Sequence, residues 1–287
     1  MDKPYVVSAD IYLLMKEWAI QYGFVLPEKE FFSQLRKEFS RYMKKAIFPN
    51  FELVSEQEIS QGLADLVHES DLPVISLDRV YVKEELNLEI TRLVDEKGKD
   101  RGLGRRAGTP PIWQQIKKLQ MSGVHEVALV DDVIFSGTVL ERIINLLSRI
   151  NIQVPIICAG IGIGEGINRI KATKRQVRCV RTYEKVIDEV CERDFYPGTP
   201  LSGRLLTGGM NIGVPYILPF GNPKDWASIP SEETATFSKF CLHQTILLFD
   251  EIERCSGKEV FCRDLGRKVV GLPIGGERYT DVLRKIL

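Results

Sequence analysis

The sequence predicts an α/β protein with three parts: a helical N-terminal region, a core built on a parallel sheet, and an α+β C-terminal extension. Three observations support this. The first ~70 residues carry apolar side chains at helical spacing. Residues 127–163 follow the order strand, turn, helix, strand, which is typical of a βαβ unit and a parallel sheet. A long helical pattern begins near Ser231. We therefore divide the chain into residues 1–72, 73–230 and 231–287.

Composition narrows the class of protein. The chain has 287 residues, with 39 Lys and Arg against 39 Asp and Glu, so its formal net charge is zero. Nucleic-acid-binding modules usually carry a basic excess, so no broad nucleic-acid binding is expected. With 44% hydrophobic and 27% charged residues, the chain is typical of folded globular proteins rather than disordered ones.

The expected location is the cytoplasm. No run of about 18 apolar residues is present, so we expect no membrane span. The first residues lack the apolar stretch of a secretory signal. The six cysteines are scattered without a CxxC pair, which favours free thiols in a reducing compartment over a disulfide framework.

The N-terminal region predicts three helices. Apolar stripes occur at 11–22 and 31–46, and a third helix begins at Ser55, with Glu58 placed to form a capping box, and ends at Pro73. We interpret the stripes as packing surfaces for the core or for a partner. These helices are therefore the candidate surface for a homo-oligomer or a protein partner.

In the segment after Pro73, the spacing of the apolar residues changes from helical to strand-like. Val74–Val82 predicts a strand, and alternation at 86–91 predicts a second, half-exposed strand. Residues 95–108 are rich in Gly and charge, and we expect a loop there that is too irregular for a strand or helix. Thr109-Pro110-Pro111 begins a helix that Gly123 ends.

The segment VALVDDVIFSGT carries the chemistry. Val127–Val130 predicts a strand buried on both faces, which ends at Asp131 and Asp132. Two adjacent carboxylates are costly to bury, so at least one should face the crevice at the end of the strand. The turn Ser136-Gly137-Thr138 leads into a helix, whose free N–H groups and positive dipole end favour a phosphate.

After this unit, apolar strands are expected at 154–163 and 177–183, followed by an irregular loop at 191–204. Mixed strand and turn signals occupy 213–226. Residues 258–287 predict a small hairpin and a last helix.

The segment resembles the signature of type I phosphoribosyltransferases: four apolar residues, two acidic ones, two apolar ones and a small hydroxyl- and Gly-rich loop. The resemblance implies that Asp131 and Asp132 hold the ribose hydroxyls of phosphoribosyl diphosphate (PRPP) and act in catalysis, with Mg²⁺ bridging those hydroxyls and the diphosphate. It implies that the loop wraps the 5-phosphate through Phe135, Ser136, Gly137 and Thr138.

The resemblance also implies two further parts. A mobile basic loop should close over PRPP, and Lys97–Gly108 is its candidate, with Arg105 and Arg106 meeting the diphosphate. A base-binding hood should carry an aromatic residue near an acid, for which the candidate is Asp194-Phe195-Tyr196. The alternatives are a solvated surface loop and simple packing of Phe195.

Two features depart from the family pattern. The loop is one residue short, because Thr138 follows Gly137 directly. No Gly-rich loop for diphosphate follows the first core strand, and Arg79 is the candidate replacement.

Competing motifs are absent. The chain has no G-x-x-x-x-G-K-[ST], no G-x-G-x-x-G and no metal-ligand spacing. Two hypotheses remain. The favoured one is an enzyme that transfers a phosphoribosyl group from PRPP to an unknown nitrogen acceptor, with release of diphosphate. The alternative is a non-catalytic PRPP or nucleotide sensor, or a partner-binding module of the kind that occurs in bacterial stress and defence systems.

Overall fold

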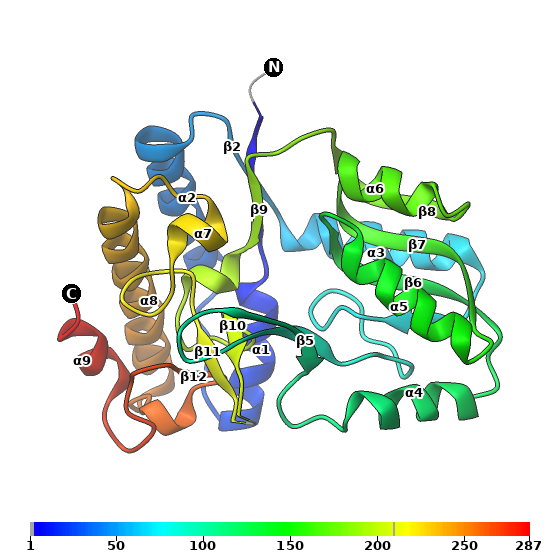
Figure 1. Ribbon diagram of the computed structural model, residues 1–287. Coiled ribbons are helices and arrows are strands. Elements are labelled where there is room, and N and C mark those ends of the chain that lie inside the picture. Colours follow the sequence, from blue (N-terminus) through cyan, green and yellow to red (C-terminus); the bar gives the residue numbers. More distant parts are fainter. Residues whose placement is uncertain (1–2, 209) are drawn as a thin grey trace. The chain divides into compact units, whose positions relative to one another are not determined.

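The computed structural model describes residues 3–208 and 210–287, and it divides the chain into two compact units (Figure 1). Unit 1 comprises Met1–Leu53, Arg92–Gly102 and Ile187–Leu287. Unit 2 comprises Val54–Thr91 and Leu103–Val186. The expected boundaries after residues 72 and 230 do not coincide with these units, because the first two predicted helices fold into one unit with the C-terminal segment, whereas the third belongs to unit 2.

Unit 2 contains the parallel sheet. Its strands are β3 (Val74–Ser76), β6 (Glu126–Ile134), β7 (Gln153–Ile163) and β8 (Gln176–Tyr183), in the order β3-β6-β7-β8. Every neighbouring pair is parallel, with Ser76 opposite Val130 and Val130 opposite Cys158. The predicted α/β class and the βαβ unit are confirmed.

Helices cover both faces of this sheet. Those of unit 2 are α3 (Glu56–Ser70), α4 (Ile112–Met121), α5 (Thr138–Arg149) and α6 (Gly164–Lys171). Gly160 of β7 lies against Ile59 of α3, whereas its neighbour Ala159 joins the core cluster that contains Leu140 of α5. Successive strand residues point to opposite faces, so α3 and α5 cover opposite faces of the sheet.

The segment between β3 and β6 differs from the prediction. The expected strand 74–82 ends at Ser76, and the expected loop 95–108 contains a strand. This segment forms β4 (Ile90–Val94) and β5 (Asp100–Arg105), which are neighbours in a sheet. Asp95 explains the turn, because its carboxylate accepts hydrogen bonds from the amides of Lys97 and Lys99, both at 3.0 Å. Such Asx turns join strands without an apolar signal.

Unit 1 contains two small sheets. The first has the order β2-β1-β9, formed by β2 (Phe51–Val54), β1 (Tyr5–Ser8) and β9 (Asp188–Cys191). The second has the order β12-β11-β10-β4-β5, where β10 is Arg204–Leu206, β11 is Ile212–Val214 and β12 is Lys268–Val269. The helices of the unit are α1 (Ile11–Tyr22), α2 (Lys29–Tyr42) with a π-helical turn at Met43–Ile47, α7 (Pro223–Ala227), α8 (Thr234–Ser256) and α9 (Tyr279–Arg284). Single 3₁₀ turns lie at Glu192–Phe195 and Cys262–Asp264.

Aromatic residues fill the core of unit 1. Trp18 of α1 stacks on Phe24 with ring centroids 4.7 Å apart, and Phe39 of α2 contacts Phe195 and Phe237. The apolar stripes predicted for the N-terminal helices are therefore used inside the unit, against α8. In the described part of the chain, no helix combines the length and apolar character needed to cross a membrane.

Candidate functional site

The acid pair lies within a strand rather than at its end. β6 continues to Ile134, with Asp131 opposite Ala159 and Ile134 opposite Gly162 of β7. The prediction that the strand ends at the two acids is corrected by this pairing. Both carboxylates are half-buried, and Asp131 Oδ1 accepts a hydrogen bond of 3.0 Å from the Asp132 amide. The two carboxylates lie close enough to interact directly, because a side-chain hydrogen bond with Asp132 acts on Asp131.

The loop after β6 leads directly into α5. Gly137 is the N-cap of α5 with φ of 74°, a left-handed conformation that favours glycine, and it provides no side-chain cap. The hydroxyls of Ser136 and Thr138 lie 3.2 Å apart. Phe135 is half-exposed. Ser136 Oγ also accepts a hydrogen bond of 3.5 Å from the Thr138 amide. An anion at the start of this 12-residue helix would therefore share that amide with Ser136.

Glycines of the next βα unit allow this loop to pack closely. A Cβ atom at Gly166 in α6 would collide with the carbonyl oxygen of Phe135. A Cβ atom at Gly160 in β7 would lie 2.8 Å from the carbonyl oxygen of Asp132. Glycines alternate at 160, 162, 164 and 166 without forming a dinucleotide fingerprint. Gly160 and Gly166 were the available signal that another backbone approaches this segment.

Asp78 is a site residue that the sequence analysis missed. Its side chain is 4% exposed and follows β3, which lies beside β6 in the sheet. The carboxylate accepts hydrogen bonds from the amides of Val80 at 2.9 Å, Tyr81 at 2.6 Å and Val82 at 2.7 Å. Residues 78–82 therefore form a tight loop without glycine, which explains why the expected strand stops at Ser76.

Three carboxylates interact at this edge of the sheet. Burial, together with the charges of Asp132 and Asp78, raises the pKa of Asp131 well above its usual range. Burial and the charge of Asp132 raise the pKa of Asp78 to about 6, although its three amide partners oppose the shift. Groups that donate hydrogen bonds or carry positive charge would favour the ionised forms of the Asp131 and Asp78 carboxylates. Sugar hydroxyls and cations are such groups.

Metal binding by protein groups alone has no support in the described residues. Within residues 3–208 and 210–287, no group of three or more His, Cys, Asp or Glu side chains is arranged to hold a metal ion. Carboxylate oxygens suit Mg²⁺, which usually keeps water or substrate oxygens among its ligands. Asp131 and Asp132 therefore fit a cation whose remaining ligands come from a bound substrate.

Two of the three arginines predicted for diphosphate are engaged in an internal cluster. Arg79 forms an ion pair of 2.9 Å with Glu89, and Arg106 lies 3.3 Å from the same carboxylate. Arg106 also donates a hydrogen bond of 3.1 Å to the carbonyl oxygen of Leu77, at the end of β3. The exposed Arg105 donates to the carbonyl oxygen of Thr109. Arg79 and Arg106 thus share one carboxylate, Glu89, which offsets one of their two positive charges.

The predicted base-binding residues lie in unit 1 and are buried. Phe195 is fully buried and Tyr196 is 1% exposed. Phe195 forms an edge-to-face pair with Phe237 at 5.0 Å. Asp194 accepts a hydrogen bond of 2.8 Å from the Gly203 amide, and burial raises its pKa. Neither ring offers a free face to a base, so the base-binding prediction is replaced by core packing.

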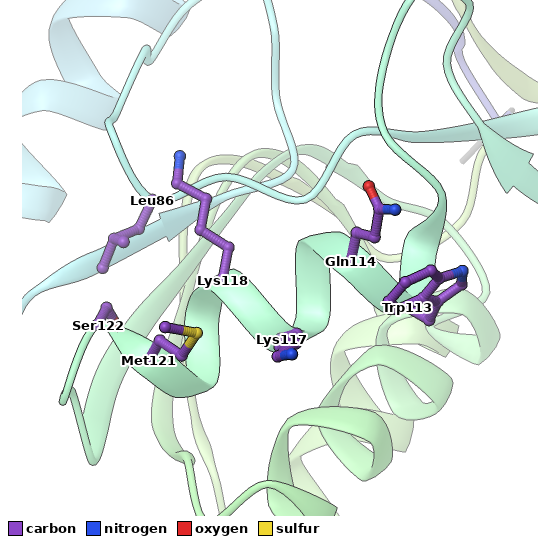
Figure 2. Close-up of a pocket in the computed structure, with 7 residues that line it drawn as sticks. All are labelled: Leu86, Trp113, Gln114, Lys117, Lys118, Met121 and Ser122. Carbon is purple, nitrogen blue, oxygen red and sulfur yellow. The ribbon is translucent and has the colours of Figure 1, made fainter.

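A separate groove runs along α4 (Figure 2). It has a volume of about 620 Å³ and contains no predicted site residue. Trp113 and Met121 are 65% and 76% exposed there. The groove is lined by Leu86, Trp113, Gln114, Lys117, Lys118, Met121 and Ser122.

Comparison with known proteins gives similarity to solved structures only. No family model matches the sequence, and no curated protein matches it. The orotate phosphoribosyltransferase of Aeropyrum pernix is 18% identical over 44% of this chain and 69% of that chain, with a TM-score of 0.28.

Two further similar structures are of the same type. The orotate phosphoribosyltransferase of Mycobacterium tuberculosis H37Rv in complex with PRPP is 12% identical over 43% of this chain and 70% of that chain, with a TM-score of 0.26. The adenine phosphoribosyltransferase of Thermoanaerobacter pseudethanolicus is 12% identical over 44% of this chain and 80% of that chain, with a TM-score of 0.26. TM-scores of 0.26–0.28 are too low to establish a function for this chain.

Proposed function

We propose that unit 2 binds a 5-phosphorylated pentose, with PRPP as the substrate, and that the protein transfers the phosphoribosyl group to a nitrogen acceptor. The observation that carries this proposal is the continuous arrangement of Asp131, Asp132 and the Phe135–Thr138 loop between β6 and α5. Carboxylates for hydroxyls and amides for a phosphate lie within eight residues, and a pentose 5-phosphate presents both groups within one small molecule.

Each group has a role in this proposal. The amides at the start of α5 and the hydroxyls of Ser136 and Thr138 hold the 5-phosphate. Asp131 and Asp132 accept hydrogen bonds from the ribose hydroxyls, which stabilises the ionised form of Asp131 against its burial and the neighbouring charges. Asp131 and Asp132 would hold Mg²⁺, which when bound would supply positive charge to the diphosphate leaving group.

The carboxylates also suit the reaction. Transfer of a pentosyl group passes through a state with positive charge on the sugar, and fixed negative charges in a partly dry site stabilise such a state. Orientation of the sugar by the phosphate loop supplies the remaining contribution. The protein needs no covalent intermediate for this chemistry.

A second candidate function has its own support. The amides after β3 are bonded to Asp78, and Arg79 and Arg106 are bonded to Glu89. These groups at the β3 edge are therefore committed to internal partners, which favours a protein that binds the ligand without turnover. A sensor of a phosphorylated pentose or a nucleotide is the corresponding function.

Calorimetry with PRPP, with and without Mg²⁺, tests the proposal. We expect binding by the wild type and at least about tenfold weaker binding by Asp131→Asn/Asp132→Asn, because two acceptors of hydroxyl hydrogen bonds lose their charge. The matched control is Asp65→Asn, which removes an exposed charge from α3 of the same unit. No binding of any pentose 5-phosphate by the wild type would reject the proposal.

Turnover is measured separately. Release of diphosphate from PRPP is followed across a panel of nitrogen bases. Release that depends on one base and disappears in the double variant supports the transferase. If PRPP binds but no base leads to release of diphosphate, the sensor is the function that remains.

A further inference from the structure

We propose that the groove along α4 is a docking site for an acidic amphipathic helix of a partner protein. The groove lies within unit 2 and has a volume of about 620 Å³. Its lining includes none of the residues that are proposed to hold the pentose or its phosphate. The docking site is therefore independent of the proposed function.

The exposed side of α4 is apolar where a solvated helix face would be polar. Leu119, which is 1% exposed, packs into the core of unit 2. On the opposite side, Trp113 and Met121 are 65% and 76% exposed. Figure 2 shows these two side chains near opposite ends of α4, with Lys117 between them. Residues four apart lie on one stripe of a helix, and exposed Trp and Met are enriched in protein interfaces.

The charged residues in the groove are both cations. Its lining contains Lys117 and Lys118 and no acidic residue. Within the part of the chain that the structure describes, neither ammonium group has an ion-pair partner, although Glu84 and Glu85 directly precede Leu86 in the lining. A partner that covers the groove must supply carboxylates on the α4 side, because an ammonium group that is buried without a partner is costly.

The spacing of the apolar residues fits a helix as the occupant. Trp113 and Met121 are eight positions apart, which corresponds to about 12 Å along α4. A partner helix with apolar residues at i and i+7 spans about 10.5 Å, and an acid at i+3 or i+4 then faces Lys117. Leu86, from the segment before β4, supplies the wall that α4 does not. Amphipathic helices are bound in apolar grooves through such anchors.

Titration of the full chain with a synthetic peptide tests the docking site. The probe is a helix-forming peptide of about 18 residues, without Trp, that carries Leu on one face and Glu beside it. We expect a Kd on the order of 10–100 µM. The emission of Trp113 should shift to shorter wavelength, because its exposed indole becomes buried. Trp113→Phe should lose this shift and still bind the labelled peptide, as measured by fluorescence anisotropy.

Exchange of charges tests the role of the lysines. The same peptide with Lys in place of each Glu should bind the wild type at least about tenfold more weakly. Lys117→Glu/Lys118→Glu should reverse this preference. The matched control is Lys171→Glu/Lys185→Glu, which changes the net charge equally at two exposed lysines of unit 2 outside the groove. This control should keep the preference of the wild type.

Three results would overturn the proposal. One is equal binding of the acidic and basic peptides to the wild type, or no binding of either. Another is binding to vesicles of anionic lipid without binding of the acidic peptide, which would make the groove a membrane contact. The third is self-association that Trp113→Ser abolishes, because a second copy would then occupy the groove. If Lys117→Glu/Lys118→Glu does not fold, as judged by circular dichroism, the two peptides compared on the wild type still decide the question.

Discussion

Both units bury carboxylates, but the groups that surround these carboxylates differ. In unit 1, Glu192 is 3% exposed and accepts hydrogen bonds from Arg36 at 2.9 and 3.0 Å. It also accepts from the amides of Asp10 and Ile11, where α1 begins. In unit 2, the neighbours that act most strongly on Asp131 are two other carboxylates, Asp132 and Asp78.

The difference separates structural from functional charge. A buried carboxylate with an arginine and two amides is satisfied within the protein, so its removal leaves the partners unpaired. Like charges held close together lower stability, and under the proposed function the ligand requires them at this position. The same type of substitution should therefore have opposite effects on stability in the two units.

Glu192→Ala should have the largest effect. We expect the free energy of unfolding to fall by about 3–5 kcal/mol, because Arg36 and the amides at the start of α1 lose their acceptor. Urea denaturation provides the measurement. Glu38→Ala removes an exposed partner of Arg41 and should cost less than about 1 kcal/mol. A similar loss in both variants would contradict the structural role of Glu192.

Gly166→Ala tests the packing around the phosphate loop. The added methyl group collides with the backbone of Phe135, so we expect a loss of about 1–3 kcal/mol in stability and weaker binding of ribose 5-phosphate. Gly123→Ala is the control. Gly123 has φ of 76° and open space around its Cβ position, so its loss of about 1 kcal/mol should leave ligand affinity unchanged. Equal ligand affinity in the Gly166 variant and the wild type would argue against the site.

Asp131→Asn should raise stability at pH 7 by about 1 kcal/mol while it weakens ligand binding. The pKa of Asp131 is raised in the folded protein, so the unfolded chain loses this proton first as the pH rises. Stability from this group therefore falls between about pH 4 and the higher folded pKa. Asp131→Asn lacks this ionisable group, so its stability does not fall with pH for this reason.

Denaturation at pH 5 and pH 7 checks the sign. The wild type should lose more stability between these pH values than Asp131→Asn. Asp78, with a pKa of about 6, and Asp10, with a pKa of about 7, add the same kind of slope to both proteins. A variant less stable than the wild type at pH 7 would mean that Asp131 is a structural acid like Glu192.

The smallest effect is expected in the α4 groove. Trp113→Ser and Met121→Ser each replace a highly exposed side chain and should change stability by less than about 0.5 kcal/mol. Leu119→Ala on the same helix is the contrast. Leu119 is 1% exposed, so its truncation should cost about 2–5 kcal/mol.

The parallel core could be predicted because its signals are local. The apolar run Val127–Val130 and the amphipathic helix that follows indicate their own structure, and the structure confirms both. The extent of β6 could not be predicted, because pairing with β7 carries the strand past Asp131 and Asp132. Polar residues continue a strand where a neighbouring strand supplies the hydrogen bonds.

The residues whose roles could not be predicted from the sequence are those whose surroundings are set by tertiary structure. Asp78 resembles an interruption in an apolar strand, and only its three amide partners show that it ends that strand. Phe195 and Tyr196 were candidates for base binding because the family resemblance implies an aromatic residue near an acid, here Asp194. Their burial depends on Phe39 and Phe237, which are distant in sequence. The sequence alone offered no signal of that proximity.

The pairing of β1 with β9 has a consequence for synthesis of the chain. Tyr5 lies opposite Asp188, so the first strand leaves the ribosome more than 180 residues before its partner. At a synthesis rate of about 5–20 residues per second, β1 and the apolar face of α1 remain without that partner for roughly 10–40 s. Unit 1 is also made of three separate stretches of chain, interrupted twice by unit 2. Neither unit can therefore be excised as one uninterrupted piece. Because β1 pairs with β9, a nascent chain halted before residue 187 would carry an unpaired strand edge that favours aggregation.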